Sequence, residues 1–305
     1  MFIADTHCDT LFSLAIEGKQ LRDCMVSHEN LIKGGVCLQT LALFTGAKGP
    51  AGTPYADALK MLEAAHDLPF PVLYGDLPDN PPEEITGIIS IEGGEALEGK
   101  TERLYEFDRL ARVRMIALTW NHENEIGYPA KLGPKPGLKP FGFELIREMD
   151  RLGIYADVSH LNEAGFWDLC ENMKLPPIAS HSNFRELCDV PRNLTRKQVQ
   201  TIIDRNGYIG INFYPHFLTA NGKAGISDVL RHMDAIADMG GIGAMGFGSD
   251  FDGIEVQPEG LENASKFPDL IDAMLRHGYS DEQVKGIAGM NFWRLLKRAE
   301  AVRAK

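Results

Sequence analysis

Three features of the 305-residue chain predict an α/β protein, a (β/α)8 TIM-type barrel. Eight short apolar runs alternate with longer helical patterns along the chain. Several runs, such as Gly-Ile-Ile-Ser-Ile at 87–91, are almost continuously apolar, which is typical of parallel strands buried on both faces. Histidines and carboxylates recur directly after these runs. The alternation alone fits a doubly wound open sheet equally well, so the position of the polar residues favours the barrel.

The apolar runs place the expected strands, and apolar residues at helical spacing place the helices. The strands are expected at 2–5, 36–43, 87–91, 114–118, 155–158, 178–180, 208–212 and 244–248. Helical spacing marks the segments 55–66, 142–152, 162–173, 226–239 and 267–277. Two further helices begin at capping boxes, in which Thr195 precedes Gln198 and Ser280 precedes Gln283.

No linker or internal repeat divides the chain, so residues 1–305 are expected to form one barrel domain. A Gly/Pro-rich loop at about 122–142 interrupts the pattern after the fourth strand. A loop of this length either covers a site or is a plain surface excursion, and the sequence leaves both open.

The composition is that of a soluble globular protein with an acidic surface. Hydrophobic residues make up 44% and charged residues 24%, and the net charge is −12. Such a surface repels phosphate backbones, so no nucleic-acid partner is expected. No apolar stretch reaches the roughly 18 residues of a membrane span, so no membrane association is expected. Five scattered cysteines and the lack of a signal-peptide pattern predict a cytoplasmic location.

Residue types that bind metals recur at the carboxyl ends of five predicted strands. They follow strands one, three, five, six and eight and are, in order, His7 with Asp9, Glu92, His160, His181 and Asp250. A closed barrel brings the carboxyl ends of all its strands to one rim. These residues, although far apart in the chain, are therefore expected to converge.

Each of these residues also has a structural explanation when it is taken alone. His7 and Asp9 fit a buried hydrogen-bonded pair, although side chains at i and i+2 of an extended segment can share one cation. Glu92 ends a buried strand and needs a partner because an unpaired buried charge is costly, or it lies at the start of a helix. Asp252, two residues after Asp250, is expected to be a turn residue.

Taken together, the residues favour a metal centre. Imidazole nitrogens and carboxylate oxygens suit zinc and its first-row neighbours. Three histidines and two or three carboxylates exceed the ligands of one tetrahedral zinc. Two metals roughly 3.5–4 Å apart and bridged by one carboxylate account for the set. The sequence therefore predicts two Zn²⁺, with other divalent metals as the alternative.

The ordered motifs resemble the renal (membrane) dipeptidase family, which are zinc dipeptidases of the amidohydrolase-like barrel group. Each motif is weak alone, and the ordered set is specific. The resemblance covers almost the full length, through Asp5-Thr-His-Cys-Asp9, Ile91-Glu-Gly-Gly94, Leu118-Thr-Trp-Asn121, Asp157-Val-Ser-His160, Ser180-His-Ser182, Val190-Pro-Arg-Asn193, Asn212-Phe-Tyr214 and Gly248-Ser-Asp-Phe-Asp-Gly253.

The resemblance implies a ligand set for two zinc ions. It implies that His7 and Asp9 bind one ion, that His160 and His181 bind the other, and that Glu92 bridges them.

The resemblance also implies roles in substrate binding and turnover. Asp250 matches the acid/base aspartate, Arg192 matches the arginine that binds the substrate carboxylate, and Tyr214 is a further substrate-binding candidate. The planar guanidinium of arginine suits a carboxylate because it donates two parallel hydrogen bonds.

The chain departs from the family pattern at two substrate positions. Trp120 stands where renal-type members carry a substrate-contacting histidine. His122, two residues further on, is the candidate replacement, and a loop-surface role is its alternative. A further family tyrosine is replaced by Phe217. Both differences concern the substrate rather than the metals.

The implied activity is hydrolysis of the peptide bond of a small dipeptide. A hydroxide bridging two zinc ions would attack the carbonyl, and Asp250 would pass its proton to the leaving amine. The resemblance also implies tolerance of a D-residue at the C-terminal position. Family members are often homodimers, although no apolar stripe here requires one.

Two other functions stay open. One is a related amidohydrolase that acts on N-acyl amino acids. The other is a non-catalytic metal-binding barrel, which the intact Asp250 disfavours.

Overall fold

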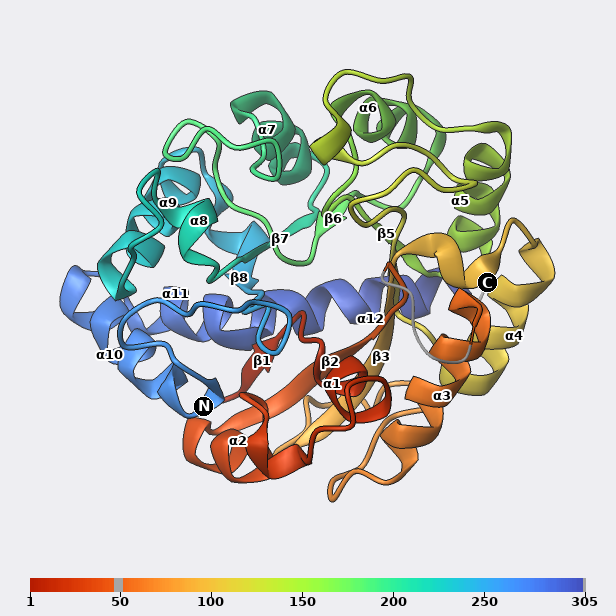
Figure 1. Cartoon of the computed structure of the whole chain (residues 1–305). Helices are drawn as coiled ribbons and strands as arrows, with labels where there is room; N and C mark the ends of the chain where they lie inside the picture. Colours follow the sequence, from red (N-terminus) through yellow and green to blue (C-terminus); the bar gives the residue numbers. More distant parts are fainter. Residues whose placement is uncertain (47–51, 304–305) are drawn as a thin grey trace.

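The computed structural model describes residues 1–46 and 52–303, and its centre is a closed barrel of eight parallel strands (Figure 1). Each strand pairs with the next one along the chain, and Phe247 of the last pairs with Asp5 of the first. The predicted barrel is confirmed, and the open sheet is excluded. The strands are β1 (Ile3–Asp5), β2 (Val36–Phe44), β3 (Thr86–Glu92), β4 (Met115–Ala117), β5 (Tyr155–Asp157), β6 (Ile178–Ala179), β7 (Tyr208–Ile211) and β8 (Met245–Phe247).

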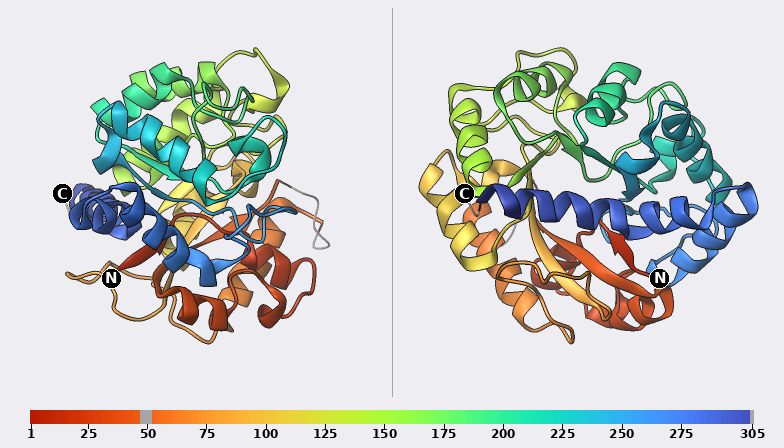
Figure 2. Two further views of the ribbon diagram at one scale, coloured as in Figure 1. Left: turned by 90° about the vertical axis from the view of Figure 1, so that its left-hand side faces the viewer. Right: turned by 180° about the vertical axis from the view of Figure 1, so that it is seen from behind.

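Helices surround the barrel (Figure 2). They are α1 (Thr10–Ala15), α2 (His28–Gly34), α3 (Pro54–His66), α4 (Thr101–Ala111), α5 (Pro140–Leu152), α6 (Glu163–Asn172), α7 (Arg196–Asp204), α8 (Pro215–Leu218), α9 (Ile226–Asp238), α10 (Phe267–His277), α11 (Asp281–Lys285) and α12 (Asn291–Arg303). Short 3₁₀ turns lie at Leu21–Asp23, Gly94–Leu97, Ala130–Leu132, Gly241–Ala244 and Ala264–Lys266, and a π-helical turn lies at Gly286–Met290. Within the described ranges, no helix is both long enough and apolar enough to cross a bilayer.

The local sequence signals identified some helices and missed others. Both predicted capping boxes are present, at Thr195 before α7 and at Ser280 before α11. The helices α1, α2, α4 and α8 were not predicted from the sequence, and α4 begins without a side-chain cap at Lys100. The loop after β4 ends at residue 139 rather than 142, because Pro140 starts α5. Proline suits the first turn of a helix, where its missing N–H is not needed.

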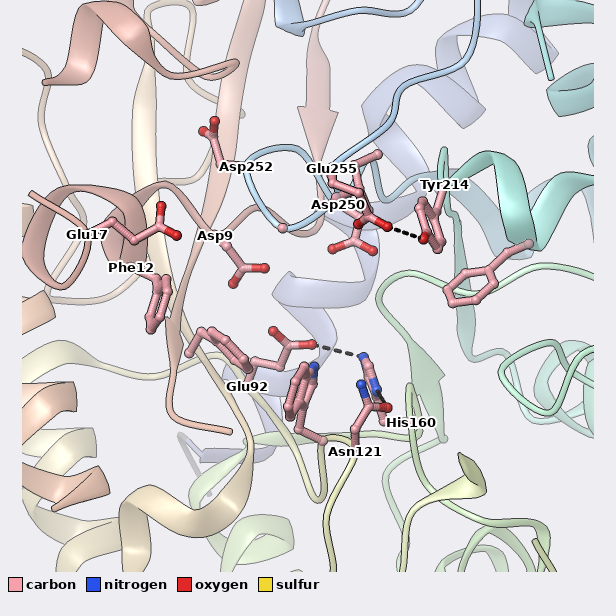
Figure 3. A pocket seen from close by; sticks show the side chains of 15 residues that line it. Asp9, Phe12, Glu17, Glu92, Asn121, His160, Tyr214, Asp250, Asp252 and Glu255 are labelled. Atoms are coloured by element: carbon pink, nitrogen blue, oxygen red, sulfur yellow. Dashed lines mark hydrogen bonds and ion pairs between the residues drawn. The ribbon is translucent and has the colours of Figure 1, made fainter. Parts of the chain in front are cut away.

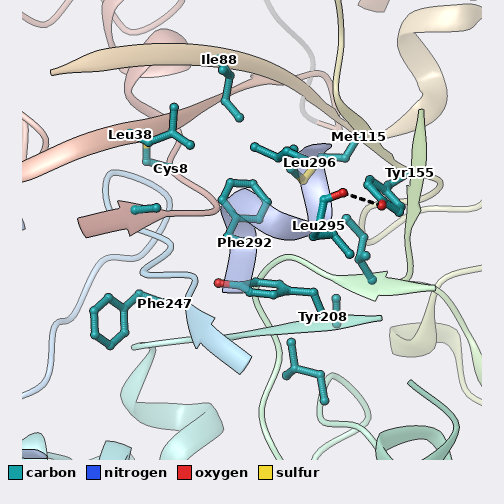
Figure 4. Close-up of a cluster of buried hydrophobic side chains, with 14 of the residues drawn as sticks. Cys8, Leu38, Ile88, Met115, Tyr155, Tyr208, Phe247, Phe292, Leu295 and Leu296 are labelled. Carbon is teal, nitrogen blue, oxygen red and sulfur yellow. Dashed lines mark hydrogen bonds between the residues drawn. The ribbon is translucent and has the colours of Figure 1, made fainter. Parts of the chain in front are cut away.

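The amino end of the barrel is closed by α12, which crosses it (Figure 2). Phe292 packs against Tyr208 with ring centroids 5.3 Å apart, and the Tyr155 hydroxyl donates to the Leu295 carbonyl at 2.7 Å. These side chains form one buried cluster with Leu38 and other apolar strand residues (Figure 4). The amino end is therefore filled, and the carboxyl end is left for a site.

Small residues pack the barrel interior between these two ends. A Cβ added to Gly248 or to Gly210 would lie 1.9 Å from the Ser180 carbonyl oxygen. The Thr6 hydroxyl donates to that same carbonyl at 2.6 Å and also to the Phe247 carbonyl at 2.8 Å. Glycine is therefore required at 210 and 248 for the strands to approach this closely.

Candidate active site

The six residues predicted to converge do lie together at the carboxyl end of the barrel. Asp9, Glu92, His160 and Asp250 line a pocket of about 320 Å³ (Figure 3). All six are nearly inaccessible to solvent, with exposed fractions of 2% for His7, 5% for Asp9, 3% for Glu92, 8% for His160, 0% for His181 and 8% for Asp250. The barrel therefore brings together side chains from five of its strands, as the sequence predicted.

Glu92, the last residue of β3, is the centre of this cluster. Its Oε2 lies 3.4 Å from His7 Nε2. Its Oε1 lies 3.0 Å from His160 Nε2 and 3.4 Å from His181 Nε2. The two oxygens of one carboxylate thus face different histidines.

The donor atoms form two overlapping groups. His7, Glu92 and His181 form one, and His7, Asp9 and Asp250 form the other, each with donor atoms within 4.8 Å of one another. His7 Nε2 lies 3.7 Å from Asp9 Oδ2 and 3.8 Å from Asp250 Oδ1.

The donor set fits divalent metal ions. Within the described part of the chain, His7 Nε2 and Asp9 Oδ1 are buried without a hydrogen-bond partner. Buried polar atoms left without partners are costly, and a cation beside them would remove that cost. Three imidazoles with carboxylates are the ligand types that zinc and its first-row neighbours prefer.

Neighbouring groups orient the two histidines that follow β5 and β6. His160 Nδ1 is 3.2 Å from Asn121 Oδ1, an acceptor, so this nitrogen carries the proton. Ser180 Oγ donates to Asp157 Oδ2 and accepts from His181 Nδ1 at 2.7 Å. Both histidines therefore direct an unprotonated Nε2 toward the other and toward Glu92, as metal-binding histidines do.

The cluster is electrostatically strained in the absence of a cation. Burial, together with the charge of Glu92, raises the pKa of Asp9 to about 8 and that of Asp250 to about 6. Burial and the nearby Arg192 lower the pKa of His160 to about 4. Burial would lower the pKa of His7, but the carboxylates of Glu92 and Asp9 raise it well above its ordinary value. Several buried carboxylates facing one another call for positive charge among them.

Asp250 adopts a left-handed backbone conformation, with φ of 64°, in the loop after β8. Its Oδ2 accepts a hydrogen bond of 2.8 Å from Asn212 Nδ2, while Oδ1 faces His7. A Cβ at Gly253 would lie 2.1 Å from Asp9 Oδ2, so only glycine leaves room for that carboxylate. Asp252 lies in a turn, as predicted. Its side chain also accepts from Thr10 Oγ1 at 2.6 Å and from the Met25 amide at 2.7 Å, so it ties this turn to distant segments.

Arg192 is buried next to the cluster but is not among the residues lining the pocket. Its guanidinium donates to the His181 carbonyl at 3.1 Å and to Ser182 Oγ at 3.2 Å. It lies over the ring of Phe217, 5.3 Å from the centroid.

The remaining substrate candidates lie at different distances from the pocket. Tyr214 lines it and donates its hydroxyl to Glu255 Oε1 at 2.6 Å. Trp120 also lines it and packs edge-on against Phe44 at 4.9 Å. His122 is exposed and outside the pocket lining, with its ring centroid 5.6 Å from that of Trp120.

Several residues around the site received no role from the sequence. Asn121, Asp157 and Asn212 orient site residues and belong to the motifs that carry the family resemblance, so membership in those motifs was the available signal. Phe12 and Glu17 lie on the opposite side of Asp9 from Tyr214 (Figure 3), and nothing in the local sequence marks them.

The family model of membrane dipeptidases, peptidase family M19, matches residues 1–305. The chain belongs to this family of metallopeptidases. It is a metal-dependent dipeptidase, a hydrolase that acts on small peptides. Membership in the family argues against the non-catalytic barrel that the sequence left open.

Two curated proteins are similar to most of this chain. An uncharacterised dipeptidase of Schizosaccharomyces pombe is 30% identical over 98% of this chain and 81% of its own length. A Klebsiella pneumoniae protein named only for its position in the pqqA 5′ region is 34% identical over 69% of this chain and 80% of its own.

Two crystal structures superpose on nearly the whole barrel. A family M19 metallopeptidase named dipeptidase AC has a TM-score of 0.86 and 26% identity, covering 97% of this chain and 98% of its own. A metallopeptidase of Rhodobacter sphaeroides, liganded with a phosphinate mimic of the dipeptide L-Ala-D-Ala, has a TM-score of 0.87 and 25% identity, covering 98% and 99%.

Proposed function

We propose that this member of the family is a binuclear zinc dipeptidase in which Glu92 bridges the two metals. The observation that carries the proposal is the division of the Glu92 oxygens, one 3.4 Å from His7 Nε2 and the other 3.0 Å from His160 Nε2. A carboxylate that served a single ion would not need histidines on both sides.

In this proposal His7 and Asp9 would hold one ion, His160 and His181 would hold the other, and Glu92 would serve both. When bound, such ions lower the pKa of ligated water toward neutrality and polarise the scissile carbonyl. The buried Nε2 of His7 and Oδ1 of Asp9, which have no partner within the described residues, support this assignment.

Asp250 acts in this proposal as the general base and then the general acid. It takes the proton of the attacking water and delivers it to the amine that leaves. Asn212 holds its Oδ2 at 2.8 Å, which leaves Oδ1 directed into the cluster, 3.8 Å from His7 Nε2.

Arg192 binds the C-terminal carboxylate of the substrate in this proposal, so the enzyme measures peptide length from that end. Its guanidinium is buried, and its Nε has no partner within the described residues. Tyr214 contributes from the pocket wall. His122 stays the candidate for the family's substrate-contacting histidine, although it lies outside the pocket lining.

We also propose that the enzyme accepts a D-residue at the C-terminal position of the dipeptide. The Rhodobacter sphaeroides relative holds a mimic of L-Ala-D-Ala and superposes with a TM-score of 0.87.

The test combines metal analysis with a substrate panel. The wild-type protein, supplied with zinc, should contain two zinc ions by elemental analysis and should hydrolyse L-L and L-D dipeptides faster than D-L dipeptides or N-acyl amino acids. Glu92→Gln should lose both metals and activity, whereas Glu17→Gln, which changes a pocket carboxylate outside the ligand set, should keep both metals. Two zinc ions retained in Glu92→Gln would refute the bridge, and faster cleavage of N-acyl amino acids would refute the dipeptidase assignment.

A further inference from the structure

A second cavity, of about 910 Å³, lies at the amino end of the barrel. Its lining residues lie on α5 and α12, at the end of α6 and in the segments that follow α6 and α7. Five basic side chains line it: Arg147, Arg151, Lys174, Arg205 and Arg298. Asp150 is the only carboxylate among its described lining residues. A cavity of this charge is unexpected on a chain with a net charge of −12.

Most of this positive charge is not neutralised by the protein. Arg151 pairs with Glu148 at 2.7 Å. Within the described residues, no carboxylate forms an ion pair with Arg147, Lys174, Arg205 or Arg298. Most other arginines of the chain, by contrast, have acidic partners, as Arg112 and Arg114 do with Glu300.

The carboxylate of Asp150 already accepts hydrogen bonds from two backbone amides. Asp150 Oδ2 accepts from the Lys174 amide at 2.7 Å, and Oδ1 accepts from the Leu175 amide at 2.8 Å. Asp150 therefore holds the chain between α6 and β6 in place, and its oxygens do not pair with the guanidinium groups.

Two of the arginines are fixed in position by backbone carbonyls. Arg205 donates to the carbonyls of Cys170 and Met173, both at 2.6 Å, and Arg298 donates to that of Asn206 at 2.8 Å. Carbonyl acceptors orient a guanidinium without cancelling its charge. Capping the end of α6 explains Arg205. It does not explain why the side chains of Arg147 and Lys174, which contact no acceptor within the described residues, line the same cavity.

We propose that this cavity binds a small polyanion that carries at least two phosphate groups. Guanidinium groups match phosphate oxygens in pairs, and a concave cluster of like charges focuses the local potential. The volume suits a small-molecule ligand. Because the cavity lies at the opposite end of the barrel from Glu92 and the histidines, its ligand is not a competitor of the peptide substrate. The inference is independent of the proposed function.

The probe is inorganic pyrophosphate, titrated into the metal-loaded enzyme in a calorimeter. One saturable site is expected, with affinity that falls as salt rises, because salt screens exposed charges. The double variant Arg147→Gln with Lys174→Gln should lower the affinity at least ~10-fold, because the charge-assisted hydrogen bonds from both side chains to the anion are lost. Arg276→Gln, which removes an exposed arginine of α10, is the matched control and should leave the affinity unchanged.

Pyrophosphate also binds metal ions, so the titration is repeated on Glu92→Gln. Binding that persists in Glu92→Gln and weakens in the cavity variant supports the proposal. Binding that disappears in Glu92→Gln but survives in the cavity variant places the anion at the metal centre and overturns it. Absence of a saturable site in the wild type also overturns it. Citrate binding as tightly as pyrophosphate would overturn the assignment to phosphate.

Discussion

The two ends of the barrel use the same strands for different purposes. β5 begins with Tyr155, whose hydroxyl donates to a carbonyl of α12 among apolar side chains. It ends with Asp157, which accepts from the Ser180 hydroxyl that orients the candidate ligand His181. β7 begins with Tyr208 against Phe292 and is followed by Asn212, which holds Asp250. One end is packed for stability, and the other concentrates buried polar groups, as is general for this fold.

The two ends also differ in where non-glycine residues adopt the left-handed backbone conformation. At the amino end, left-handed residues such as Arg112 terminate a helix, which is an ordinary way to end one. At the carboxyl end, His160, Asp250 and Asp252 have φ of 69°, 64° and 65° in the loops that follow β5 and β8. Non-glycine residues in this conformation are strained and cluster at functional sites. We therefore expect substitutions at the carboxyl end to affect catalysis and substitutions at the amino end to affect stability.

The largest expected effect is at the carboxyl end. Asp250→Asn should lower kcat by roughly 10²–10⁴-fold, because it removes a general acid/base. Asparagine keeps an oxygen for Asn212, so metal content and melting temperature should stay close to those of wild type. Steady-state kinetics and elemental analysis check this, and a loss of less than about tenfold would remove Asp250 from the catalytic step.

At the amino end, Phe292→Ala should destabilise the fold without changing the chemistry. The ring is 1% exposed, and truncating such a residue costs about 3–5 kcal/mol. Urea unfolding measures the loss, and kcat of the folded variant at low temperature should match wild type. A fall in kcat comparable to that of Asp250→Asn would mean that the two ends are not separable.

A third substitution tests a buried histidine that ties together loops of the carboxyl end. His232 Nδ1 accepts from the Phe184 amide at 3.1 Å and Nε2 donates to the Leu218 carbonyl at 3.0 Å, so the ring is neutral. Burial lowers its pKa to about 4. The unfolded chain, with a pKa near 6.5, then takes up the proton first as the pH falls.

This contribution to stability is complete above pH ~6.5 and is lost toward pH ~4, with about 2 kcal/mol gone by pH 5. His232→Gln should unfold more easily at pH 7.5, because the hydrogen bonds of the imidazole are changed. Its free energy of unfolding should also fall less than that of wild type between pH 7.5 and pH 5. Equal slopes for the two proteins would rule out His232 as the source.

The smallest effect is expected at Arg192. Arg192→Ala should raise KM about tenfold for dipeptides with a free carboxylate, because charge-assisted hydrogen bonds are lost. C-terminally amidated dipeptides should be affected much less. Arg192→Lys should recover part of the loss, since it restores the charge but not the planar fork. An equal rise in KM for both substrate types would contradict the assignment.

The sequence alone determined the alternation of elements, the capping boxes before α7 and α11, and the metal-ligand types at the strand ends. These signals are local, because periodicity and caps depend on residues a few positions apart. Helices with weaker local signals, such as α4, escaped prediction, and Pro140 moved the end of the predicted loop.

Only the tertiary structure decided what surrounds those ligands. Glu92 lies between histidines that follow different strands, and Asn212 donates a hydrogen bond to Asp250. Phe12 and Glu17 line the same pocket. All of these contacts join residues that are distant in the sequence. The basic cavity likewise collects side chains from α5 and α12 and from the segments that follow α6 and α7. Such contacts depend on barrel closure and on rotamers selected by packing, and no pattern of neighbouring residues encodes them.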